Sequence, residues 1–319
     1  MNRGESMMTL RVEPRTVLQW EQFIKEKPPF SIALDGYVRG KPRFDPKGPY
    51  VNFNHHEEVD RLGTRATCAQ VAVAIKQGLF ETFQQKSEPH ANVYVNDPDQ
   101  DTCLAVWLLQ NSERVSGKKS EPLVNRLIGV EDLLDVTAGA YPFDPSMVVL
   151  CELAWIFEPY TCVRVNGRLQ HLGAGEMRNV IESVCQRITK YTLGQGEKIL
   201  LDTRYVILYT GPGWKLVNEI GPHARTALFA EGTKAFAAVR NNHDGTYTYS
   251  LGRLSQYVLF PLEKLYARMN EEEGLDPQGE NSWGGGDTVG GSPRKTGSKL
   301  APDSLTKIIN DELAKQQTS

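Results

Sequence analysis

Residues 91–110, ANVYVNDPDQDTCLAVWLLQ, place a strand, an acidic turn and a helix in immediate succession. Residues 92–95 are predicted to form the strand, and the apolar run at 102–110 predicts a helix that packs on the sheet. The turn between them, NDPDQD, lies where the strand ends. This order is that of a doubly wound α/β domain, in which ligands bind at the carboxyl edge of the sheet.

The chain before this segment shows the same alternation of strand and helix. Residues 31–35, SIALD, predict a short buried strand that ends in Asp35, and residues 50–54 predict a second extended piece after a Gly- and Pro-rich connection. From residue 67 the apolar spacing changes to that of a helix. The expected fold class is therefore α/β, with a doubly wound, mostly parallel sheet in the first domain.

The second half of the chain differs in composition. Residues 175–191 carry the apolar stripe of an amphipathic helix, which we interpret as a connector between domains. Beyond it, β-branched and aromatic residues punctuated by glycines predict a smaller, strand-rich α/β domain. Extended segments are expected at 199–208, 226–239 and 246–251, and a last helix at 302–315. The expected boundaries are 1–165 for the first domain, 166–198 for the connector and 199–319 for the second domain.

The composition is that of an ordinary globular chain. Its 319 residues favour two domains, and 40% hydrophobic and 24% charged residues are usual values. No apolar run reaches the roughly 18 residues that span a bilayer, and residues 1–16 lack the apolar core of a signal peptide, so we expect a cytoplasmic protein without membrane contact. The five cysteines include no C-x-x-C pair, which argues against a zinc knuckle. A net charge of −3 gives no general attraction to nucleic acid.

The acidic turn carries Asp97, Asp99 and Asp101 at alternate positions. Alternate carboxylates in an extended turn point to one side, and hard divalent cations bind clustered carboxylates. The other interpretation is helix capping, because Asp is favoured at helix N-termini. Capping accounts easily for one of the three acids, and we predict a metal site at this turn.

Two adjacent histidines follow the second extended piece, in NFNHHEEV at residues 52–59. Neighbouring strand residues point to opposite faces, so His55 and His56 can share a site only at a strand end or turn. Neutral imidazole binds manganese, iron or zinc, and Asn54 and Glu57 are placed to orient the rings. A pair of surface histidines is the commoner explanation of such a pair taken alone.

Two further acids, Asp35 and Asp135, follow apolar segments. A lone Asp in such a position commonly begins a turn. Taken together, however, five carboxylates and two histidines at predicted strand ends suit a two-metal site. Such a site, with metals about 3.5–4 Å apart, clamps a phosphoryl group and activates water.

These segments resemble the motifs of the DHH superfamily of phosphoesterases with its DHH-associated C-terminal domain. The family's strand-end acid, D-H-H triplet, P-D-x-D loop and D-T-G-like segment are similar to Asp35, residues 54–56, residues 98–101 and Asp135. Downstream, TYTYSLGRLS at 246–255 and WGGGDTVGGSPR at 283–294 resemble a strand and the G-G-G-H loop of the associated domain. This chain has Asn54 in place of the triplet's acid and Asp287 in place of the loop's histidine, and its segments come in a different order.

The resemblance implies a phosphoesterase with two divalent cations, manganese before magnesium because the site is rich in carboxylates. The implied substrate is a phosphorylated small molecule or short nucleic acid: a nucleotide, a short oligonucleotide or a cyclic dinucleotide. The first domain is then catalytic, through metal-activated water, and the second binds substrate. The implied metal ligands are Asp35, His55, Asp97, Asp99, Asp101 and Asp135, and the implied catalytic residues are His56 and Asp101.

The second domain supplies the residues expected to hold a phosphate. Backbone N–H groups of a Gly-rich loop approach an anion closely, and arginines contact its oxygens. The other interpretation of residues 274–297 is a flexible connector. The expected substrate-binding residues are Arg253, Gly284, Gly285, Gly286, Asp287 and Arg294.

Two other classes of function are compatible with the sequence. One is a catalytically silent nucleotide-binding or regulatory protein, in which Asn54 and the lack of the histidine that the family has upstream of its P-D-x-D loop have weakened the metal site. The other is a structural or assembly protein whose histidine pair and acidic turn are surface features. The sequence leaves open pyrophosphate as a substrate and whether the chain forms a homodimer.

Overall fold

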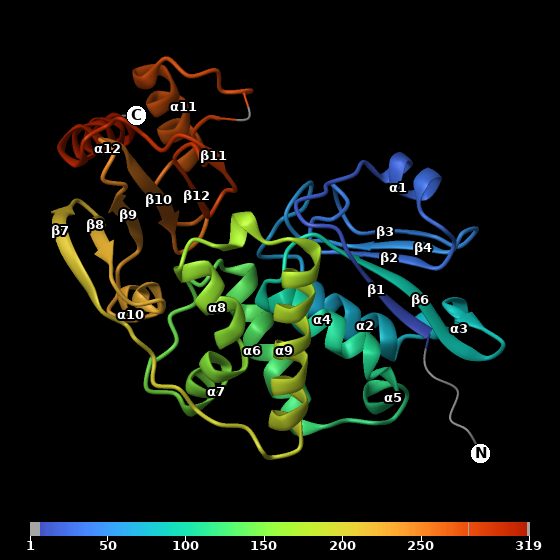
Figure 1. Ribbon diagram of the computed structural model, residues 1–319. Coiled ribbons are helices and arrows are strands. Elements are labelled where there is room, and N and C mark those ends of the chain that lie inside the picture. The colour runs from blue at the N-terminus through green and yellow to red at the C-terminus, as the bar shows by residue number, and fades with distance from the viewer. Residues whose placement is uncertain (1–6, 280, 318–319) are drawn as a thin grey trace. The chain divides into compact units, whose positions relative to one another are not determined.

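The computed structural model describes residues 7–279 and 281–317, which form two compact units (Figure 1). Unit 1 comprises Met1–Val136 and Val148–Leu200, and unit 2 comprises Thr137–Met147 and Leu201–Ser319. The chain is a mixed α/β protein, as expected, and each unit contains one mixed sheet. No helix among the described residues is long and apolar enough to cross a membrane.

The sheet of unit 1 has the strand order β1-β6-β2-β4-β3, and β5 pairs with the first residues of β6. The pairs β1–β6, β6–β2 and β2–β4 are parallel, whereas β3 and β5 pair in the antiparallel direction. All four residues of β2 are buried, as in a strand covered on both faces. The strands are β1 (Met7–Val12), β2 (Ser31–Leu34), β3 (Arg43–Asp45), β4 (Tyr50–Phe53), β5 (Gln84–Gln85) and β6 (Glu88–Val95).

Helices cover this sheet because each presents an apolar face. On one side Phe23 of α1 (Trp20–Glu26) packs with Ala33, Tyr37 and Tyr94. In α4 (Gln100–Gln110) nine consecutive residues are buried, and this helix packs against α2, α6 and α9. The remaining helices of unit 1 are α2 (Thr67–Lys76), α3 (Leu79–Thr82), α5 (Ser112–Val115), α6 (Pro122–Val136), α7 (Val148–Ile156), α8 (Glu158–Val165), the 3-10 turn η1 (Leu169–His171) and α9 (Ala174–Thr192).

The helix expected to connect the domains is instead part of unit 1. The apolar residues Met177, Ile181 and Val184 of α9 are buried, and the helix contacts α4, α7, α8 and β1. Its amphipathic stripe is therefore explained by packing within one unit. The chain passes into unit 2 at Leu201, and a short excursion, Thr137–Met147, also belongs to unit 2.

Unit 2 contains a second mixed sheet with the order β11-β12-β10-β9-β8-β7. One face packs on α11 (Leu262–Glu273) and α12 (Pro302–Gln317), and the other packs on α10 (Ala224–Ala230). All pairs are antiparallel except β8–β9. The strands are β7 (Tyr205–Gly211), β8 (Trp214–Glu219), β9 (Ala235–Asn241), β10 (Tyr247–Arg253), β11 (Gly284–Gly285) and β12 (Val289–Gly291).

Three expectations for this unit need correction. The segment expected to be extended from 226 to 239 begins inside α10, because a parallel pair such as β8–β9 needs a crossover connection. The strand expected from 199 starts only at Tyr205. The segment 274–297 is not a structureless connector: it contains the hairpin β11–β12 and the buried Trp283, which stacks on Tyr249 with ring centroids 5.7 Å apart.

Candidate metal centre

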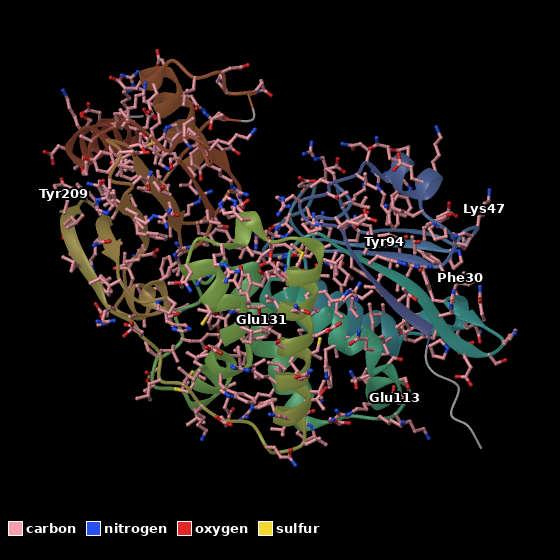
Figure 2. All side chains as sticks on the ribbon, in the orientation of Figure 1. Phe30, Lys47, Tyr94, Glu113, Glu131 and Tyr209 are labelled. Carbon is pink, nitrogen blue, oxygen red and sulfur yellow. The ribbon has the colours of Figure 1, made fainter. Side chains whose placement is uncertain are left out.

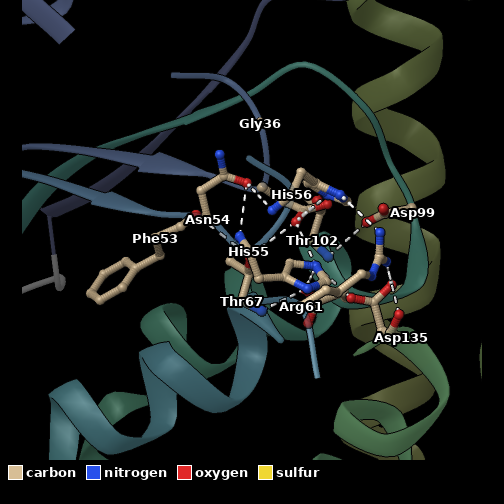
Figure 3. A network of polar contacts seen from close by, with 12 residues as sticks. Gly36, Phe53, Asn54, His55, His56, Arg61, Thr67, Asp99, Thr102 and Asp135 are labelled. Atoms are coloured by element: carbon tan, nitrogen blue, oxygen red, sulfur yellow. Dashed lines mark hydrogen bonds and ion pairs between the residues drawn. The ribbon is translucent and has the colours of Figure 1, made fainter. Parts of the chain in front are cut away.

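Three parallel strands of unit 1 end at the same edge of the sheet, and each is followed by polar residues. Leu34 pairs with Phe53 at the ends of β2 and β4, so the residues that follow them, Asp35 and Asn54, lie at the ends of two neighbouring strands. Ala33 pairs with Tyr94, so the acidic turn that follows β6 lies beside them. Asp35 has a φ of +45°, in the left-handed region that Asp tolerates better than most residues. The carboxyl edge of this sheet therefore collects the acids and histidines (Figure 3).

The imidazole of His55 lies at the centre of three carboxylates. Its Nε2 is 2.6 Å from Asp135 Oδ2, 3.4 Å from Asp35 Oδ1 and 3.9 Å from Asp101 Oδ2. The side chain is fully buried. The side chains of the site form two overlapping groups, and within each group the possible ligand atoms lie within 4.8 Å of one another. One group is Asp35, His55 and His56, and the other is His55, Asp101 and Asp135.

The second histidine differs from the first in its exposure. His56 Nε2 is 2.9 Å from Asp35 Oδ1, and its side chain is 34% exposed. Its Nδ1 is 3.4 Å from Nη1 of Arg61, which can only donate. The contact with Arg61 thus leaves Nδ1 as the acceptor, and Nε2 donates its proton to Asp35.

Asn54 explains how two neighbouring histidines reach the same site. Its Oδ1 accepts hydrogen bonds from the backbone N–H groups of His55 and His56, at 2.9 and 3.1 Å. Its Nδ2 donates to the carbonyl oxygens of Gly40 and Val38, at 2.8 and 3.3 Å. The amide therefore fixes the turn after β4 and places the two imidazole rings 4.4 Å apart.

Asp101 and Thr67 tie the site to the start of α2. The two oxygens of Asp101 accept from the backbone N–H groups of Thr67 and Cys68, both at 2.7 Å. The hydroxyl of Thr67 donates to Asp35 Oδ1 at 3.0 Å. Asp101 stabilises a helix N-terminus, where a negative charge is favoured. Thr67 was not among the predicted site residues, because a threonine at the start of a helix has an ordinary capping role.

The other two acids of the turn are placed differently. Asp99 caps α4, accepting from the backbone N–H of Thr102 at 2.8 Å, which is the alternative role considered for one of the three acids. Asp97 and Asp99 interact electrostatically with each other, and Asp99 also with Asp35. Neither Asp97 nor Asp99 belongs to the two groups described above.

Asp135 reaches the site from a helix, not from a strand end as expected. It lies in the last turn of α6, where it faces His55. Arg61 holds this end of the helix, because its Nη2 donates to the carbonyl oxygen of Asp135 at 2.8 Å. One turn earlier on α6, Glu131 is buried, and its Oε2 has no hydrogen-bond partner among the described residues. An isolated Glu in an apolar helix gives no sequence signal for this placement.

The crowding of acids changes their proton affinities. Burial, together with the charges of Asp135 and Asp35, raises the pKa of Asp101 to about 7. Burial and the neighbouring carboxylates raise the pKa of Asp99 well above its usual value. Burial opposes the protonation of His55, yet Asp135 and Asp35 raise its pKa to about 10. Burial and mutual repulsion thus disfavour the ionised forms of Asp99 and Asp101, and the neighbouring carboxylates favour the protonated form of His55.

The residues present fit a divalent cation. Nε2 of His55 and Oδ2 of Asp135 are buried and 2.6 Å apart, but among the described residues neither has a partner with hydrogen-bonding geometry. Buried polar atoms are normally satisfied, so this pair marks a place for a bound group. The available donors are carboxylate oxygens and imidazole nitrogens, which suit manganese or magnesium better than a thiolate-bound metal.

The residues expected to bind substrate in unit 2 have structural partners. Arg253 donates to the carbonyl oxygens of Asp287, Val258 and Phe260, at 2.6, 3.3 and 3.3 Å. Gly284 and Gly285 pair with β12, and Gly286 donates its N–H to Val289. Arg294 is exposed in the turn that follows. The structure brings Arg253 and Asp287 together. The backbone of the segment from Gly284 to Gly286 forms hydrogen bonds with β12.

Comparison with models of protein families finds none that this chain matches, and comparison with curated proteins finds no match either.

Proposed function

We propose that unit 1 is a divalent-metal-dependent phosphoesterase centre that hydrolyses a nucleotide-type phosphoester. The observation that carries the proposal is the convergence of Asp35, His55, His56, Asp101 and Asp135 within two overlapping groups at the carboxyl edge of a mostly parallel sheet. This edge is where such sheets bind their ligands. The proposed metal is manganese or magnesium. The proposed substrate is a nucleotide, a short oligonucleotide or a cyclic dinucleotide.

Each residue has a distinct part in this proposal. A divalent cation held by Asp35, His55, Asp101 and Asp135 would polarise a phosphoryl oxygen and lower the pKa of water. His55 is fully buried and serves only as a ligand, whereas His56 is one-third exposed and faces the substrate side. Asp35 holds the proton of His56 at Nε2. The guanidinium of Arg61, next to His56, supplies positive charge for an anionic phosphate.

The test combines metal content by mass spectrometry with manganese-dependent hydrolysis of bis(p-nitrophenyl) phosphate. His55→Ala and Asp135→Asn should lose bound metal and hydrolysis together. The matched control is Asp132→Asn on the same helix, because Asp132 accepts from the backbone of Ala66 and belongs to neither group. Hydrolysis that persists in both variants at the wild-type rate, or wild-type protein that binds no metal, would refute the proposal.

Asp101 is unsuited to this test, although it belongs to the site. Its carboxylate accepts from two backbone N–H groups at the start of α2, so its removal would damage the helix as well as the metal centre. A loss of activity in an Asp101 variant would therefore not distinguish a ligand from a structural residue.

A specific observation favours a second function, a catalytically silent nucleotide-binding protein. Both oxygens of Asp101 are engaged by backbone amides, and Asn54 is engaged by backbone on both sides. Fewer oxygen lone pairs of these two side chains then remain available to bind a metal ion. This function predicts that nucleotides raise the melting temperature while no divalent cation supports hydrolysis.

A further inference from the structure

The chain passes between the two units at three points, after Val136, after Met147 and after Leu200. The first two points bound residues 137–147, which we call the arm. The arm leaves unit 1 directly behind a residue of the metal centre, because Asp135 lies one residue before Val136. The passage after Leu200 would be enough to join two domains. The arm is therefore an additional link between them, and it starts at the metal centre.

The arm is held in the hydrophobic core of unit 2. Ala140 is 3% exposed and belongs to a buried cluster with Val217, Phe229 and Phe236, on the face of the sheet that α10 covers. Among the residues of the arm, all of which the structure describes, only Ala140 is buried. Burial of its methyl group in this cluster stabilises the docked arm. One small side chain thus anchors the arm in unit 2.

The chain between α6 and Ala140 forms a hydrogen-bonded turn with little slack. The N–H of Ala140 donates to the carbonyl oxygen of Thr137, and the N–H of Tyr141 donates to the hydroxyl of Thr137, both at 3.0 Å. Ala138 has a φ of +52°, which is uncommon for a residue with a side chain. Such a conformation persists where the surrounding structure holds it. A displacement of Ala140 is therefore transmitted along this turn to the end of α6.

On the side of unit 1, the last turn of α6 carries Asp135 to the metal centre, one turn after Glu131 (Figure 2). Arg61 donates to the carbonyl oxygen of Asp135 at 2.8 Å. Its Oδ2 lies 2.6 Å from Nε2 of His55, and among the described residues neither atom has a partner with hydrogen-bonding geometry. Coordination of a cation by this carboxylate would restrain the end of α6 and, with it, the start of the arm.

We propose that the arm couples the metal centre to the hydrophobic core of unit 2. Cation binding at Asp135 stabilises the docked arm, and the docked arm raises the affinity of the centre for the cation. This inference rests on the metal centre proposed above and adds a regulatory link to it. The two effects are equal in size, because the coupling free energy between two binding events is reciprocal. Couplings of this kind change an affinity by about 5- to 150-fold.

Hydrogen exchange followed by mass spectrometry, with and without manganese, measures the coupling in the wild-type protein. Manganese should slow exchange around His55 in unit 1. It should also slow exchange by about fivefold or more in α10 and β9 of unit 2, which contribute residues to the cluster around Ala140. This comparison needs no variant.

A loosened arm provides the second comparison. Two glycines inserted between Gly139 and Ala140 add slack to the turn and remove no side chain. This variant should keep the manganese-dependent protection around His55 and lose that of α10 and β9. The matched control carries two glycines between Asp244 and Gly245, in the exposed turn between β9 and β10, and should behave as wild type. Circular dichroism checks that both variants are folded.

The affinity for manganese gives the reciprocal measurement. Competition with a fluorescent chelator should show a dissociation constant raised about fivefold or more by the insertion in the arm and unchanged by the control insertion. Manganese that protects the surroundings of His55 in wild type but neither α10 nor β9 would overturn the coupling while the metal centre stands. So would an insertion in the arm that leaves either the protection of unit 2 or the affinity unchanged. Manganese that alters exchange in neither unit would refute the metal centre and the coupling with it.

Discussion

Replacing Asn54 by Asp tests whether residue 54 is a ligand position or a backbone clamp. The structure assigns it to the backbone. Its Nδ2 donates to Gly40 at 2.8 Å and to Val38 at 3.3 Å, and the residue is fully buried. An Asp carboxylate cannot donate and would face the same two carbonyl oxygens. Asn54→Asp should therefore destabilise the protein and should not improve metal binding.

The magnitude follows from the bonds that are lost. A buried polar group that loses its partner costs about 1–3 kcal/mol. The Nδ2 of Asn52 also donates to both carbonyl oxygens at 3.3 Å, so neither oxygen is left without a partner. The cost of each lost hydrogen bond therefore lies in the lower part of that range. We expect the free energy of unfolding to fall by about 2–4 kcal/mol.

Urea unfolding followed by circular dichroism in the presence of a chelator measures this change. The matched control is Asn92→Asp in the same unit, because the Oδ1 of Asn92 only accepts, from Arg11, and an acid there keeps that role. The control should stay within about 0.5 kcal/mol of wild type. An Asn54→Asp protein as stable as wild type, or one that binds manganese ten times more tightly, would refute the clamp.

Three further predictions concern the same site. Thr67→Val removes the hydroxyl that donates to Asp35 and should lower the free energy of unfolding by about 2 kcal/mol, or the melting temperature by about 4–8 °C. Thr67→Ser keeps the hydroxyl and should retain most of the wild-type stability. Asp101→Asn should lower the free energy of unfolding in urea by about 2 kcal/mol, because an amide accepts only one of the two N–H bonds at the start of α2. In chelator, stability should fall from pH 7 to 9, because the pKa of His55 is raised to about 10 and the folded state holds a proton that the unfolded state releases above its ordinary value of 6.5. His55→Gln should flatten that slope in urea titrations, and an unchanged slope would contradict the assignment.

The sequence predicted the elements that carry the site. The apolar runs before Asp35 and Asp97, and the extended piece before Asn54, are strands, and the helices at 67 and 102 follow them. Local hydrophobic periodicity is enough for this, because burial of one face or both decides each element. The same reasoning correctly placed α12 and the amphipathic pattern of α9, although it mistook the role of α9.

Only the tertiary structure decided how side chains meet. The contact of Asp135 with His55 depends on the packing of α6, and the link from Thr67 to Asp35 depends on where α2 begins beside β2. The orientation of the Asn54 amide depends on carbonyl groups 14 and 16 residues away in the chain. In unit 2 the glycine segment became a hairpin because β10 offered it a pairing edge. A sequence pattern reports the burial of each residue, whereas a site requires partners distant in the chain, and these are fixed only by strand register and helix packing.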